Sequence, residues 1–586
     1  MSIVQTLVRG RALVQGFALF KPEDNDTIAY QLERHAERRP DKVFLLFSDR
    51  SYTYAEANTE INRHAYAYKL LGVDKGDVVA LVMENRPEFI FHMLALHKIG
   101  AVSSLINSNG TGDVLAHAIR ICEPKRVVVG SELWATFVEM REQLDSTDNV
   151  DIDMDPENPA EIDLPVFQER LVEASGDNPP ESGTHQLKEQ AAFIYTSGTT
   201  GMPKAAKVMH HRLFRGGRVW WGLALRYEKD AVLYCCLPLY HSNATILALS
   251  SVVSAGVTIA LSRKFSRSRF WDECRRFNCT SFIYIGELCR YLMNAPPSDG
   301  DRDHNVQVVT GNGLRPDIWQ EFQDRFGIKR VAEFYGATEG NCITVNFRGV
   351  VGSVGPMTPG MMLARWDEEE QTFIRGDDGF LVKAKAGENG ILLGKIRPRQ
   401  EFDGYQDKSA SEKKVLHDAF EKGDSYFDTG DLLRVDRGRN LFFVDRLGDT
   451  FRWKGENVAT FEVQEQITKW DPVDEVNVYG VQIEGTDGRA GMAALVLGDG
   501  KEFDAASFQA HVDDNLPSYA RPIFVRLLAQ IATTATMKMK KGDLQKQGFN
   551  PGATEDVIYF RHPEQGGYVP IDGAMYDGIT SGAFRL

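Results

Sequence analysis

Residues 191–204 read Ala-Ala-Phe-Ile-Tyr-Thr-Ser-Gly-Thr-Thr-Gly-Met-Pro-Lys, and this stretch decides how the rest of the chain is interpreted. The run 191–195 is apolar, aromatic and β-branched, which is typical of a buried strand. The loop after it combines glycines, which permit a tight turn, with hydroxyls, amides and a lysine that suit the oxygens of a nucleotide triphosphate. A surface loop is the alternative for a generic Gly/Ser/Thr cluster. The predicted nucleotide-binding residues of this stretch are Thr196, Ser197, Gly198, Thr199, Thr200, Gly201 and Lys204.

Two common nucleotide motifs do not explain this loop. The Gly394-Lys395 pair has Asn389 where a Walker A motif requires its first glycine. The nearest approach to Gly-x-Gly-x-x-Gly, residues 311–316, ends in proline. The unbroken Thr-Ser-Gly-Thr-Thr-Gly-x-Pro-Lys string instead resembles the phosphate loop of the acyl-adenylate-forming superfamily, which includes acyl-CoA synthetases, luciferases and peptide-synthetase adenylation domains.

Composition and charge narrow the class of protein. The chain has 586 residues, of which 43% are hydrophobic and 25% charged, as in a globular protein with an ample core. Its net charge of −15 argues against a broad nucleic-acid-binding surface. The seven cysteines include no C-x-x-C pattern, which fits a reducing compartment, so we predict a cytoplasmic protein.

Two apolar stretches bear on membrane attachment. Residues 1–20 contain Arg9 and Arg11 and lack a secretory cleavage pattern, and they fit an amphipathic helix on a membrane or on the protein's own surface. Residues 244–261 carry no charge, but Gly256 divides them into a helix-like and a strand-like part. We therefore predict no transmembrane segment.

The pattern of strand-like and helix-like segments changes twice along the chain. Residues 27–130 and 231–286 alternate strand-like and helix-like pieces, which is the rhythm of a mostly parallel sheet covered by helices. Glycines and short alternating runs from about residue 350 indicate a small antiparallel β unit. Near residue 450 the residue pattern changes again. We predict an α/β fold with a large N-terminal domain of mostly parallel sheets plus a small β-barrel (1–446, the barrel at about 350–446) and a mobile α+β C-terminal domain (447–586).

Further strings occur in the superfamily's order, and the resemblance implies a role for each. In Tyr335-Gly336-Ala-Thr338-Glu339, Thr338 contacts the α-phosphate and Glu339 ligates Mg²⁺, while Gly311-Asn312-Gly313 lies against the adenine. Asp431 accepts the ribose hydroxyls and Arg446 lies near the ribose and phosphate. Out of context, the sequence around Asp431 is ordinary β-turn chemistry.

The C-terminal part supplies a predicted hinge and a catalytic lysine. The superfamily's hinge residue corresponds to Gly448, which tolerates large backbone changes. Its C-terminal Thr-x-Thr-Gly-Lys corresponds to Thr534–Lys538, with Met537 in place of the glycine. This makes Lys538 the adenylation lysine, with nearby Lys540 and Lys541 as alternatives. His241 matches a position along the acyl path, and a structural histidine is the alternative.

The closest resemblance is to the fatty acid transport protein/very-long-chain acyl-CoA synthetase family. It covers nearly the whole chain and includes long words such as Tyr284–Leu292, Asp449–Val458 and Tyr519–Ile523. It implies a long-chain or very-long-chain fatty acyl-CoA synthetase that uses ATP, Mg²⁺ and coenzyme A. Lys204, Thr338, Glu339 and Lys538 would carry the adenylation step, in which the acyl-adenylate forms and diphosphate leaves. Coupling to fatty acid uptake is a further implication.

Other readings stay open. A fatty acyl-AMP ligase would stop at the adenylate, and a transport protein with little catalysis would be expected to lose the catalytic residues. The predicted partners are a long-chain fatty acid, ATP and CoA, and no nucleic acid. A homodimer is one option, and a peripheral contact with the cytoplasmic membrane face is another. That contact would use the N-terminal helix or the basic cluster of residues 263–276. For the basic cluster, a solvated helix face is the alternative.

Overall fold

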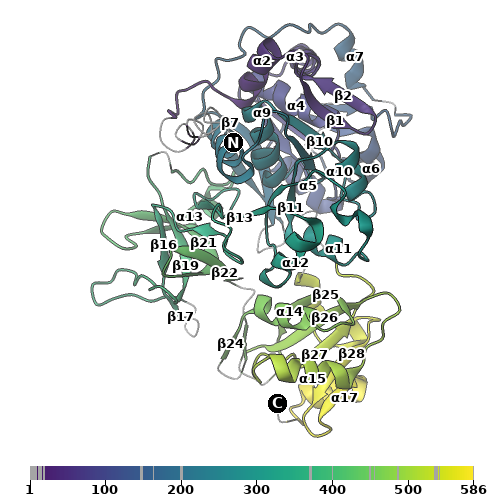
Figure 1. Ribbon diagram of the computed structural model, residues 1–586, viewed down its shortest axis with the longest axis vertical. Coiled ribbons are helices and arrows are strands. Elements are labelled where there is room, and N and C mark those ends of the chain that lie inside the picture. Colours follow the sequence, from purple (N-terminus) through teal and green to yellow (C-terminus); the bar gives the residue numbers. More distant parts are fainter. Residues whose placement is uncertain are drawn as a thin grey trace.

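The computed structural model describes residues 20–144, 149–162, 164–197, 202–367, 372–398, 400–447, 451–453, 456–484, 488–532 and 541–584, together with Gly10, Leu13, Gly16 and Met539. Two large α/β sheets lie side by side, a bent antiparallel sheet adjoins them, and a C-terminal α+β unit lies below (Figure 1). The predicted α/β class is confirmed.

The first large sheet has eight strands in the order β14-β13-β12-β11-β9-β10-β1-β2. Its six inner strands run parallel, and the edge strands β2 and β14 are antiparallel to their neighbours. The strands are β1 (Val43–Phe47), β2 (Arg50–Thr53), β9 (Val232–Cys235), β10 (Thr258–Leu261), β11 (Ser281–Ile285), β12 (Val308–Asn312), β13 (Arg330–Gly336) and β14 (Ile343–Val345).

The second large sheet has six strands in the order β6-β5-β3-β4-β7-β8. All pairs are parallel except β7–β8, which form an antiparallel hairpin at one edge. The strands are β3 (Val78–Val82), β4 (Val102–Leu105), β5 (Arg126–Gly130), β6 (Val150–Asp153), β7 (Gln190–Ser197) and β8 (Pro203–Met209). The predicted strand at 191–195 is thus part of β7.

Helices between the two sheets join them through one apolar core, to which Leu94 of α4, Val252 of α9 and Ile194 of β7 all belong. A second core, with Leu115 and Phe137, covers the other face of the six-stranded sheet. The helices of this region are α2 (Ile28–Arg38), α3 (Tyr54–Leu70), α4 (Pro87–Lys98), α5 (Gly112–Arg120), α6 (Trp134–Met140), α7 (Phe167–Val172), α8 (His210–Val219), α9 (Ser250–Ala255), α10 (Phe270–Arg276), α11 (Gly286–Met293) and α12 (Pro316–Phe326). Short helical segments are η2 (Ser131–Leu133), η3 (Arg141–Gln143), η4 (Trp220–Leu225), η5 (Asn243–Leu249), η6 (Asp299–Arg302) and η7 (Pro551–Ala553).

The uncharged stretch 244–261 contributes a helical part to the layer between the sheets and a strand to the first large sheet. The π-helical η5 continues into α9, Gly256 ends α9 in a left-handed conformation, and β10 follows as a buried strand. In the part of the chain that the structure describes, no helix combines the length and hydropathy needed to cross a membrane. The prediction of a buried helix followed by a buried strand is correct.

The predicted small β unit is a half-barrel. Its strands pair in the order β15-β22-β21-β19-β16, with β20 beside β21, and the pairing path among the described strands does not close. Two apolar clusters fill its two faces. The elements are β15 (Gly355–Pro356), β16 (Met361–Ala364), β19 (Asn389–Lys395), α13 (Lys408–Glu412), β20 (Val415–His417), β21 (Ser425–Val435), β22 (Asn440–Arg446) and the hairpin β17 (Trp366–Asp367)–β18 (Thr372–Phe373).

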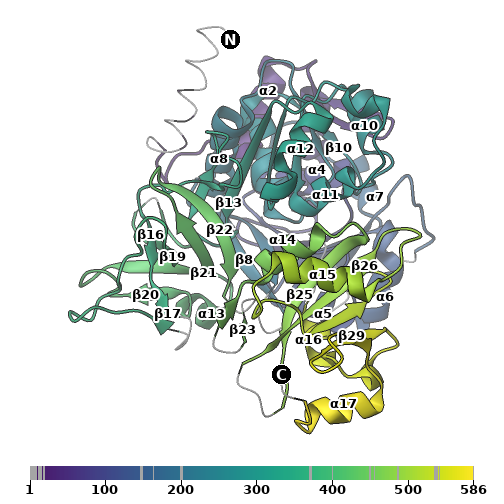
Figure 2. The same cartoon turned by 60° about the horizontal axis from the view of Figure 1, so that its bottom comes forward.

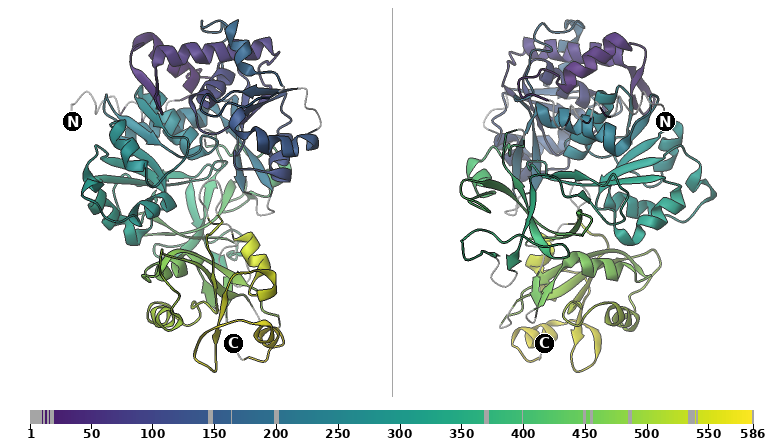
Figure 3. Two further views of the ribbon diagram at one scale, coloured as in Figure 1. Left: turned by 90° about the vertical axis from the view of Figure 1, so that its right-hand side faces the viewer. Right: turned by 60° about the vertical axis from the view of Figure 1, so that its left-hand side comes forward.

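The C-terminal unit has a sheet of its own (Figures 2 and 3). It also has a separate apolar core. Its sheet has the order β25-β26-β27-β28-β29. The elements are the hairpin β23 (Phe451–Trp453)–β24 (Glu456–Val458), α14 (Thr460–Thr468), β25 (Val473–Val481), β26 (Ala490–Leu497), α15 (Ala505–Asn515), β27 (Phe524–Leu527), α16 (Gly542–Gln547), β28 (Ile558–His562), β29 (Gly567–Pro570) and α17 (Gly573–Thr580).

A few polar contacts tie the C-terminal unit to the first large sheet. Tyr291 of α11 donates to the carboxylate of Glu475 at 3.0 Å. Arg315, just before α12, donates to Thr468 Oγ1 at 2.7 Å. Arg290 donates to the carbonyl oxygen of Asp474. These contacts join α11 and the residue before α12 to β25 and α14 of the C-terminal unit.

Candidate nucleotide and acyl site

The β7–β8 hairpin presents the predicted phosphate loop. Across the hairpin Thr196 is paired with Lys204 and Ser197 with Pro203, so the loop leaves and re-enters the sheet at adjacent positions. The loop residues Gly198, Thr199, Thr200 and Gly201 lie outside the described residues, and their role stays a prediction. The described stem places Thr196 and Lys204 at the edge of the six-stranded sheet, facing the half-barrel.

Tyr405 brings Lys204 and Glu339 to the same place. Its hydroxyl donates to Glu339 Oε1 at 2.6 Å, and Lys204 Nζ lies 5.6 Å from the centre of its ring. Its backbone forms a bridge with Ala206 of β8. Burial, and then the Glu339 carboxylate, raise the pKa of Tyr405, so the phenol keeps the proton that it donates. Tyr405 was not predicted, because it lies outside every motif and its role becomes visible only through these contacts.

The oxygen atoms gathered here suit a hard cation. The carboxylate of Glu339 is partly exposed, and the hydroxyl of Thr338 lies one residue before it. Carboxylate and hydroxyl oxygens are ligands that Mg²⁺ accepts, with nucleotide phosphates supplying the remainder. The donor set therefore fits Mg²⁺ bound at Glu339.

Arg212, on α8, holds the turn that carries Thr338 and Glu339. Its Nη1 donates to the carbonyl oxygens of Thr338 (2.9 Å) and Gly340 (2.7 Å). Its Nη2 donates to the carbonyl oxygen of Glu339 at 2.8 Å. One planar guanidinium thus fixes three consecutive carbonyl groups, which a lysine ammonium cannot do with the same geometry.

A buried carboxylate completes this clamp. Arg212 Nε donates to Asp403, whose side chain is 3% exposed. Although burial raises it, the charges of Arg212 and His211 hold the pKa of Asp403 at about 2. The carboxylate stays ionised at neutral pH and anchors the guanidinium on the side opposite the turn. Neither residue was predicted, because the two lie 191 positions apart and neither is part of a motif.

Arg212→Lys is expected to lower kcat/KM for ATP by about 10- to 100-fold, because Thr338 and Glu339 lose their fixed position while the positive charge is kept. The measurement is diphosphate release at varied ATP and Mg²⁺, with the melting temperature recorded in parallel. Arg218→Lys is the matched control, since Arg218 lies on the same helix and pairs with Asp26 instead. Equal effects of the two substitutions would contradict a positioning role for Arg212.

The predicted adenine segment is shaped by Glu333. The amide of Leu314 donates to Glu333 Oε1 at 3.1 Å, and the amide of Gly313 donates to the same oxygen. Gly313 has a φ of +88°, and a Cβ on Gly286 would lie 1.7 Å from its carbonyl oxygen, so both positions require glycine. Burial raises the pKa of Glu333 to about 8. Gly311 and Asn312 end β12 directly before this turn.

The predicted ribose residues meet across two neighbouring strands. Asp431 of β21 lies opposite Arg446 of β22, and Arg446 Nε donates to Asp431 Oδ1 at 2.9 Å. Tyr335 donates its hydroxyl to Asp431 Oδ2 at 2.5 Å. Asp431 is 4% exposed, and burial followed by the Asp431 charge raises the pKa of Tyr335. The structure therefore joins Tyr335, Asp431 and Arg446 in one hydrogen-bonded group.

A cavity of about 390 Å³ runs from the Thr338 turn into the apolar layer between the large sheets. Thr338 and Gly336 lie at its polar end, and Trp220, Ile246 and Leu223 line the apolar part. Thr338 Oγ1 donates to Ser242 Oγ at 3.0 Å, and Asn243 Nδ2 donates to Asn312 Oδ1 at 2.8 Å. The chain next to His241 thus connects the phosphate turn, the adenine segment and the cavity, while the role of His241 itself stays a prediction.

Two predicted residues, Gly448 and Lys538, lie outside the described residues, as does Lys540. Lys541 is described, and its Nζ donates to Thr460 Oγ1 at 2.9 Å, at the start of α14. Thr460 in turn donates its backbone N–H to Asp445 Oδ2 at 2.8 Å. Lys541 is therefore engaged inside the C-terminal unit in this arrangement.

The predicted basic cluster is largely neutralised. Arg263 is 16% exposed and forms ion pairs with Glu84, Asp155 and Glu157. Arg275 pairs with Asp272, and Arg276 with Asp49. The residues of the cluster without a close ion pair among those described are Lys264 and Arg267, with Arg269 3.9 Å from Glu273. The cluster is a mixed-charge surface formed by α10 and the segment before it, more than a strongly basic patch.

Comparison with known families gives two matches. Residues 32–387 match the family described as AMP-binding enzyme, and residues 462–538 match the AMP-binding enzyme C-terminal domain. Among curated relatives, the medium/long-chain fatty acid–CoA ligase FadD6 of Mycobacterium tuberculosis is 41% identical over 96% of this chain and 93% of its own length. Long-chain fatty acid transport protein 6 of Mus musculus is 39% identical over 96% of this chain and 91% of its own length.

Solved structures share the fold. An anthranilate CoA ligase in complex with anthranoyl-AMP matches with a TM-score of 0.76 and 20% identity, over 90% of this chain and 98% of that one. ATP-bound MatB from Rhodopseudomonas palustris matches with a TM-score of 0.74 and 23% identity, over 88% of this chain and 98% of that one.

Proposed function

This chain belongs to the AMP-binding enzyme family and is an AMP-forming fatty acid–CoA ligase, and from that premise we propose that it activates long-chain and very-long-chain fatty acids. The observation that carries the proposal is the cavity of about 390 Å³, which is polar at Thr338 and apolar along η4 and η5. A fatty carboxylate at the polar end would lie beside the nucleotide residues, with its chain in the apolar part. Because most of the cavity lining is apolar, each methylene of the acyl chain that is buried there makes the free energy of binding more favourable.

The chemistry follows from charge. A fatty carboxylate is ionised at neutral pH, so adenylation needs no general base. The obstacle is the approach of one anion to another, and Lys204, Lys538 and the loop amides are proposed to neutralise that charge and align the groups. Arg212 positions the Thr338 turn, and Asp431 with Arg446 holds the ribose. Glu339 would hold Mg²⁺, which when bound supplies positive charge at the phosphate oxygens.

The second half-reaction requires coenzyme A. Its thiol attacks the acyl carbon of the acyl-adenylate, a thioester bond forms, and the bond to AMP breaks. We propose that the C-terminal domain, residues 447–586, rotates about Gly448 between the two half-reactions, so that Lys538 serves only the first. The domain boundary at 446/447 is part of this proposal.

AMP release and acyl-CoA formation test the function. The measurement uses saturated acids from octanoate to hexacosanoate, each with and without CoA. We expect thioester only when CoA is present, and the highest kcat/KM among long chains. Adenylate accumulation without thioester would favour a fatty acyl-AMP ligase instead, and absence of both products would favour a transport protein with little catalysis. Octanoate as the best substrate would contradict the chain-length proposal.

Peripheral membrane contact is proposed through the part of the basic cluster with the weakest ion pairing, Lys264, Arg267 and Arg269. Three cations near one another would contribute about 1 kcal/mol each at an anionic bilayer. In flotation with phosphatidylserine-containing vesicles, Arg267→Glu/Arg269→Glu is expected to reduce the bound fraction at low salt by more than half. Arg275→Glu is the control, because Arg275 is already paired with Asp272. Unchanged binding of the double variant removes this contact from the proposal.

A further inference from the structure

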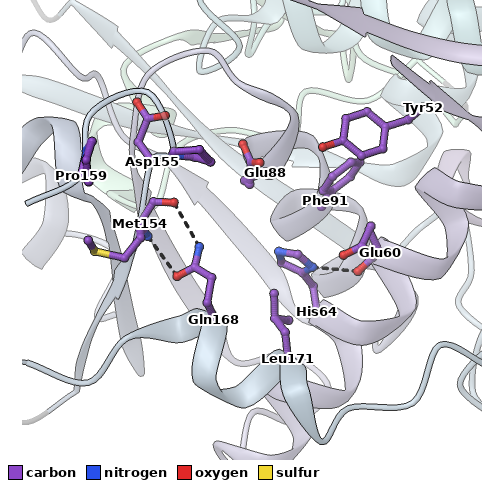
Figure 4. Close-up of a pocket in the computed structure, with 11 residues that line it drawn as sticks. Tyr52, Glu60, His64, Glu88, Phe91, Met154, Asp155, Pro159, Gln168 and Leu171 are labelled. Atoms are coloured by element: carbon purple, nitrogen blue, oxygen red, sulfur yellow. Dashed lines mark hydrogen bonds between the residues drawn. The ribbon is translucent and has the colours of Figure 1, made fainter. Parts of the chain in front are cut away.

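A second cavity, of about 330 Å³, lies away from the nucleotide residues (Figure 4). Its walls come from β2, α3, α4, α7 and the segment after β6. In the six-stranded sheet, β6 forms one edge and the phosphate-loop hairpin β7–β8 the other, with three strands between β6 and β7. Four strand spacings correspond to ~19 Å, so the cavity is separate from the site described above.

The polar groups that line this cavity are mainly hydrogen-bond acceptors. The ionisable side chains are Tyr52, Glu60, His64, Glu88 and Asp155, and no lysine or arginine is among the lining residues. The amide of Gln168 is already used, since it accepts from the Met154 N–H at 3.0 Å and donates to the Met154 carbonyl at 3.2 Å. Each carboxylate of the lining has an arginine partner outside it: Arg63 for Glu60, Arg50 for Glu88 and Arg263 for Asp155. The described lining therefore offers mainly lone pairs, and the Tyr52 hydroxyl is its one side-chain donor beside the amide of Gln168 and the ring N–H of His64.

His64 supplies an acceptor that nothing in the described chain uses. Its Nδ1 lies 2.7 Å from the carbonyl oxygen of Glu60, which can only accept, so Nδ1 carries the proton and Nε2 a free lone pair. His64 is 2% exposed, and its Nε2 has no hydrogen-bond partner among the described residues. Figure 4 shows Nε2 turned away from Glu60, toward the space between Glu88 and Gln168. Burial, and then neighbouring His92, lower the pKa of His64 to about 3, so the ring is neutral.

Glu88 and two aromatic rings face the same space. Glu88 Oε1 accepts from Arg50 at 2.5 Å, while Oε2 lies 3.3 Å from Arg86 Nη1 and accepts no hydrogen bond among the described residues. Phe91 and Tyr52 pack edge to face with ring centres 5.2 Å apart. Aromatic faces beside a carboxylate attract organic cations, and an unprotonated nitrogen requires a donor.

We propose that this cavity binds a small organic ammonium ion with a short apolar body. Its N–H groups would be donated to His64 Nε2 and Glu88, and its carbon skeleton would lie against Phe91 and Leu171. Such a ligand satisfies the buried acceptor that the chain leaves without a donor. The proposal does not depend on the ligase function, because no nucleotide or acyl residue takes part in it.

A metal ion is the competing occupant. The side chains of His64, His92 and Asp153 place one ligand atom each within 4.8 Å of one another. However, Asp153 already pairs with the buried guanidinium of Arg86, and His92 Nε2 donates to Asp153 at 3.0 Å. A metal would have to break that hydrogen bond and compete with Arg86 for the Asp153 carboxylate, both oxygens of which are already in use. The geometry therefore favours the ammonium ion.

The test titrates benzylammonium into the full chain, labelled with ¹⁵N-histidine, in an amine-free phosphate buffer. We expect saturable heat and a shift of the His64 Nε2 resonance. His64→Phe, which keeps a ring but removes the acceptor, and Leu171→Trp, which fills the cavity, should each weaken binding at least about tenfold. His304→Phe is the matched control, because His304 also has a ring nitrogen without a hydrogen-bond partner among the described residues but lies outside this cavity.

Two further ligands sharpen the outcome. Benzyltrimethylammonium has the same skeleton and charge but no N–H group, and it should bind at least about tenfold more weakly. Equal binding of the two cations overturns the role of His64. Absence of saturation up to about 10 mM benzylammonium overturns the site. Zn²⁺ that shifts His64 and His92 together, and no longer binds to His64→Phe, would show a metal site instead. Because no readout uses ATP or a fatty acid, these failures are distinguishable from failure of the ligase proposal.

Discussion

Lys538→Ala is expected to lower the rate of acyl-adenylate formation by about 10²- to 10³-fold and to leave thioester formation from supplied acyl-adenylate within about twofold of the wild type. The reason is electrostatic. A lysine beside the carboxylate and the α-phosphate lowers the repulsion between two anions, and this repulsion exists only in the first half-reaction. In the second half-reaction the thiol attacks a neutral acyl carbon, with AMP as the leaving group.

Lys541→Ala is the matched control for this prediction. Lys541 Nζ donates to Thr460 Oγ1 at 2.9 Å, so its charge is used at the start of α14. We expect adenylation by this variant to stay within about threefold of the wild type, with a lower melting temperature. If Lys541→Ala or Lys540→Ala loses adenylation and Lys538→Ala keeps it, the catalytic role moves to that lysine. Equal loss of both half-reactions in Lys538→Ala would contradict a role confined to adenylation.

Asp431→Asn is expected to lower kcat/KM for ATP by about 10²-fold, because the ribose loses a charged acceptor and Arg446 loses its partner. The amide would also direct an N–H group toward Tyr335 or Arg446, both of which donate to Asp431 at 2.5 Å and 2.9 Å. The described neighbours of Asp431 are donors, so the NH₂ group of an asparagine at this buried position would find no acceptor among them.

The preference for ATP over 2′-deoxy-ATP, measured as a ratio of kcat/KM values, distinguishes loss of ribose recognition from structural damage. The wild type should prefer ATP, since it can offer two ribose hydroxyls to Asp431, and Asp431→Asn should lose most of that preference. Asp428→Asn is the control: Asp428 Oδ1 accepts from the Gly430 N–H at 2.9 Å, so this carboxylate holds the same turn from within. It should lower the melting temperature and keep the ATP preference. A preference retained by Asp431→Asn would place the ribose elsewhere.

Local sequence signals predicted the elements well where a pattern is continuous. The predicted strand at 191–195 lies within β7 (Gln190–Ser197), and the stretch that Gly256 divides is a helix followed by β10 (Thr258–Leu261). These segments are apolar and uninterrupted by charge, so pattern and burial agree.

The parts that could not be predicted depend on contacts between distant segments. Tyr405, Glu333 and the Arg212–Asp403 pair shape the candidate site, yet each acts through a partner that no local pattern reveals. The ion pairs of the basic cluster could not be predicted for the same reason, because the carboxylates that neutralise Arg263 come from Glu84, Asp155 and Glu157. The π-helical form of η5 is also without a sequence signal here.

One hydrogen bond spans the predicted hinge. Asp445, at the end of β22, accepts from the backbone N–H of Thr460, the first residue of α14, at 2.8 Å. The half-barrel thereby caps a helix of the C-terminal domain, and such a cap stabilises a helix by about 0.5–2 kcal/mol. Rotation about Gly448 would have to uncap α14 and release the contacts of Tyr291 and Arg315 as well. The cap alone would then favour the arrangement described here over the rotated one by a factor of about 2 to 30 in the equilibrium constant. Substrate binding would have to supply the free energy that offsets this preference.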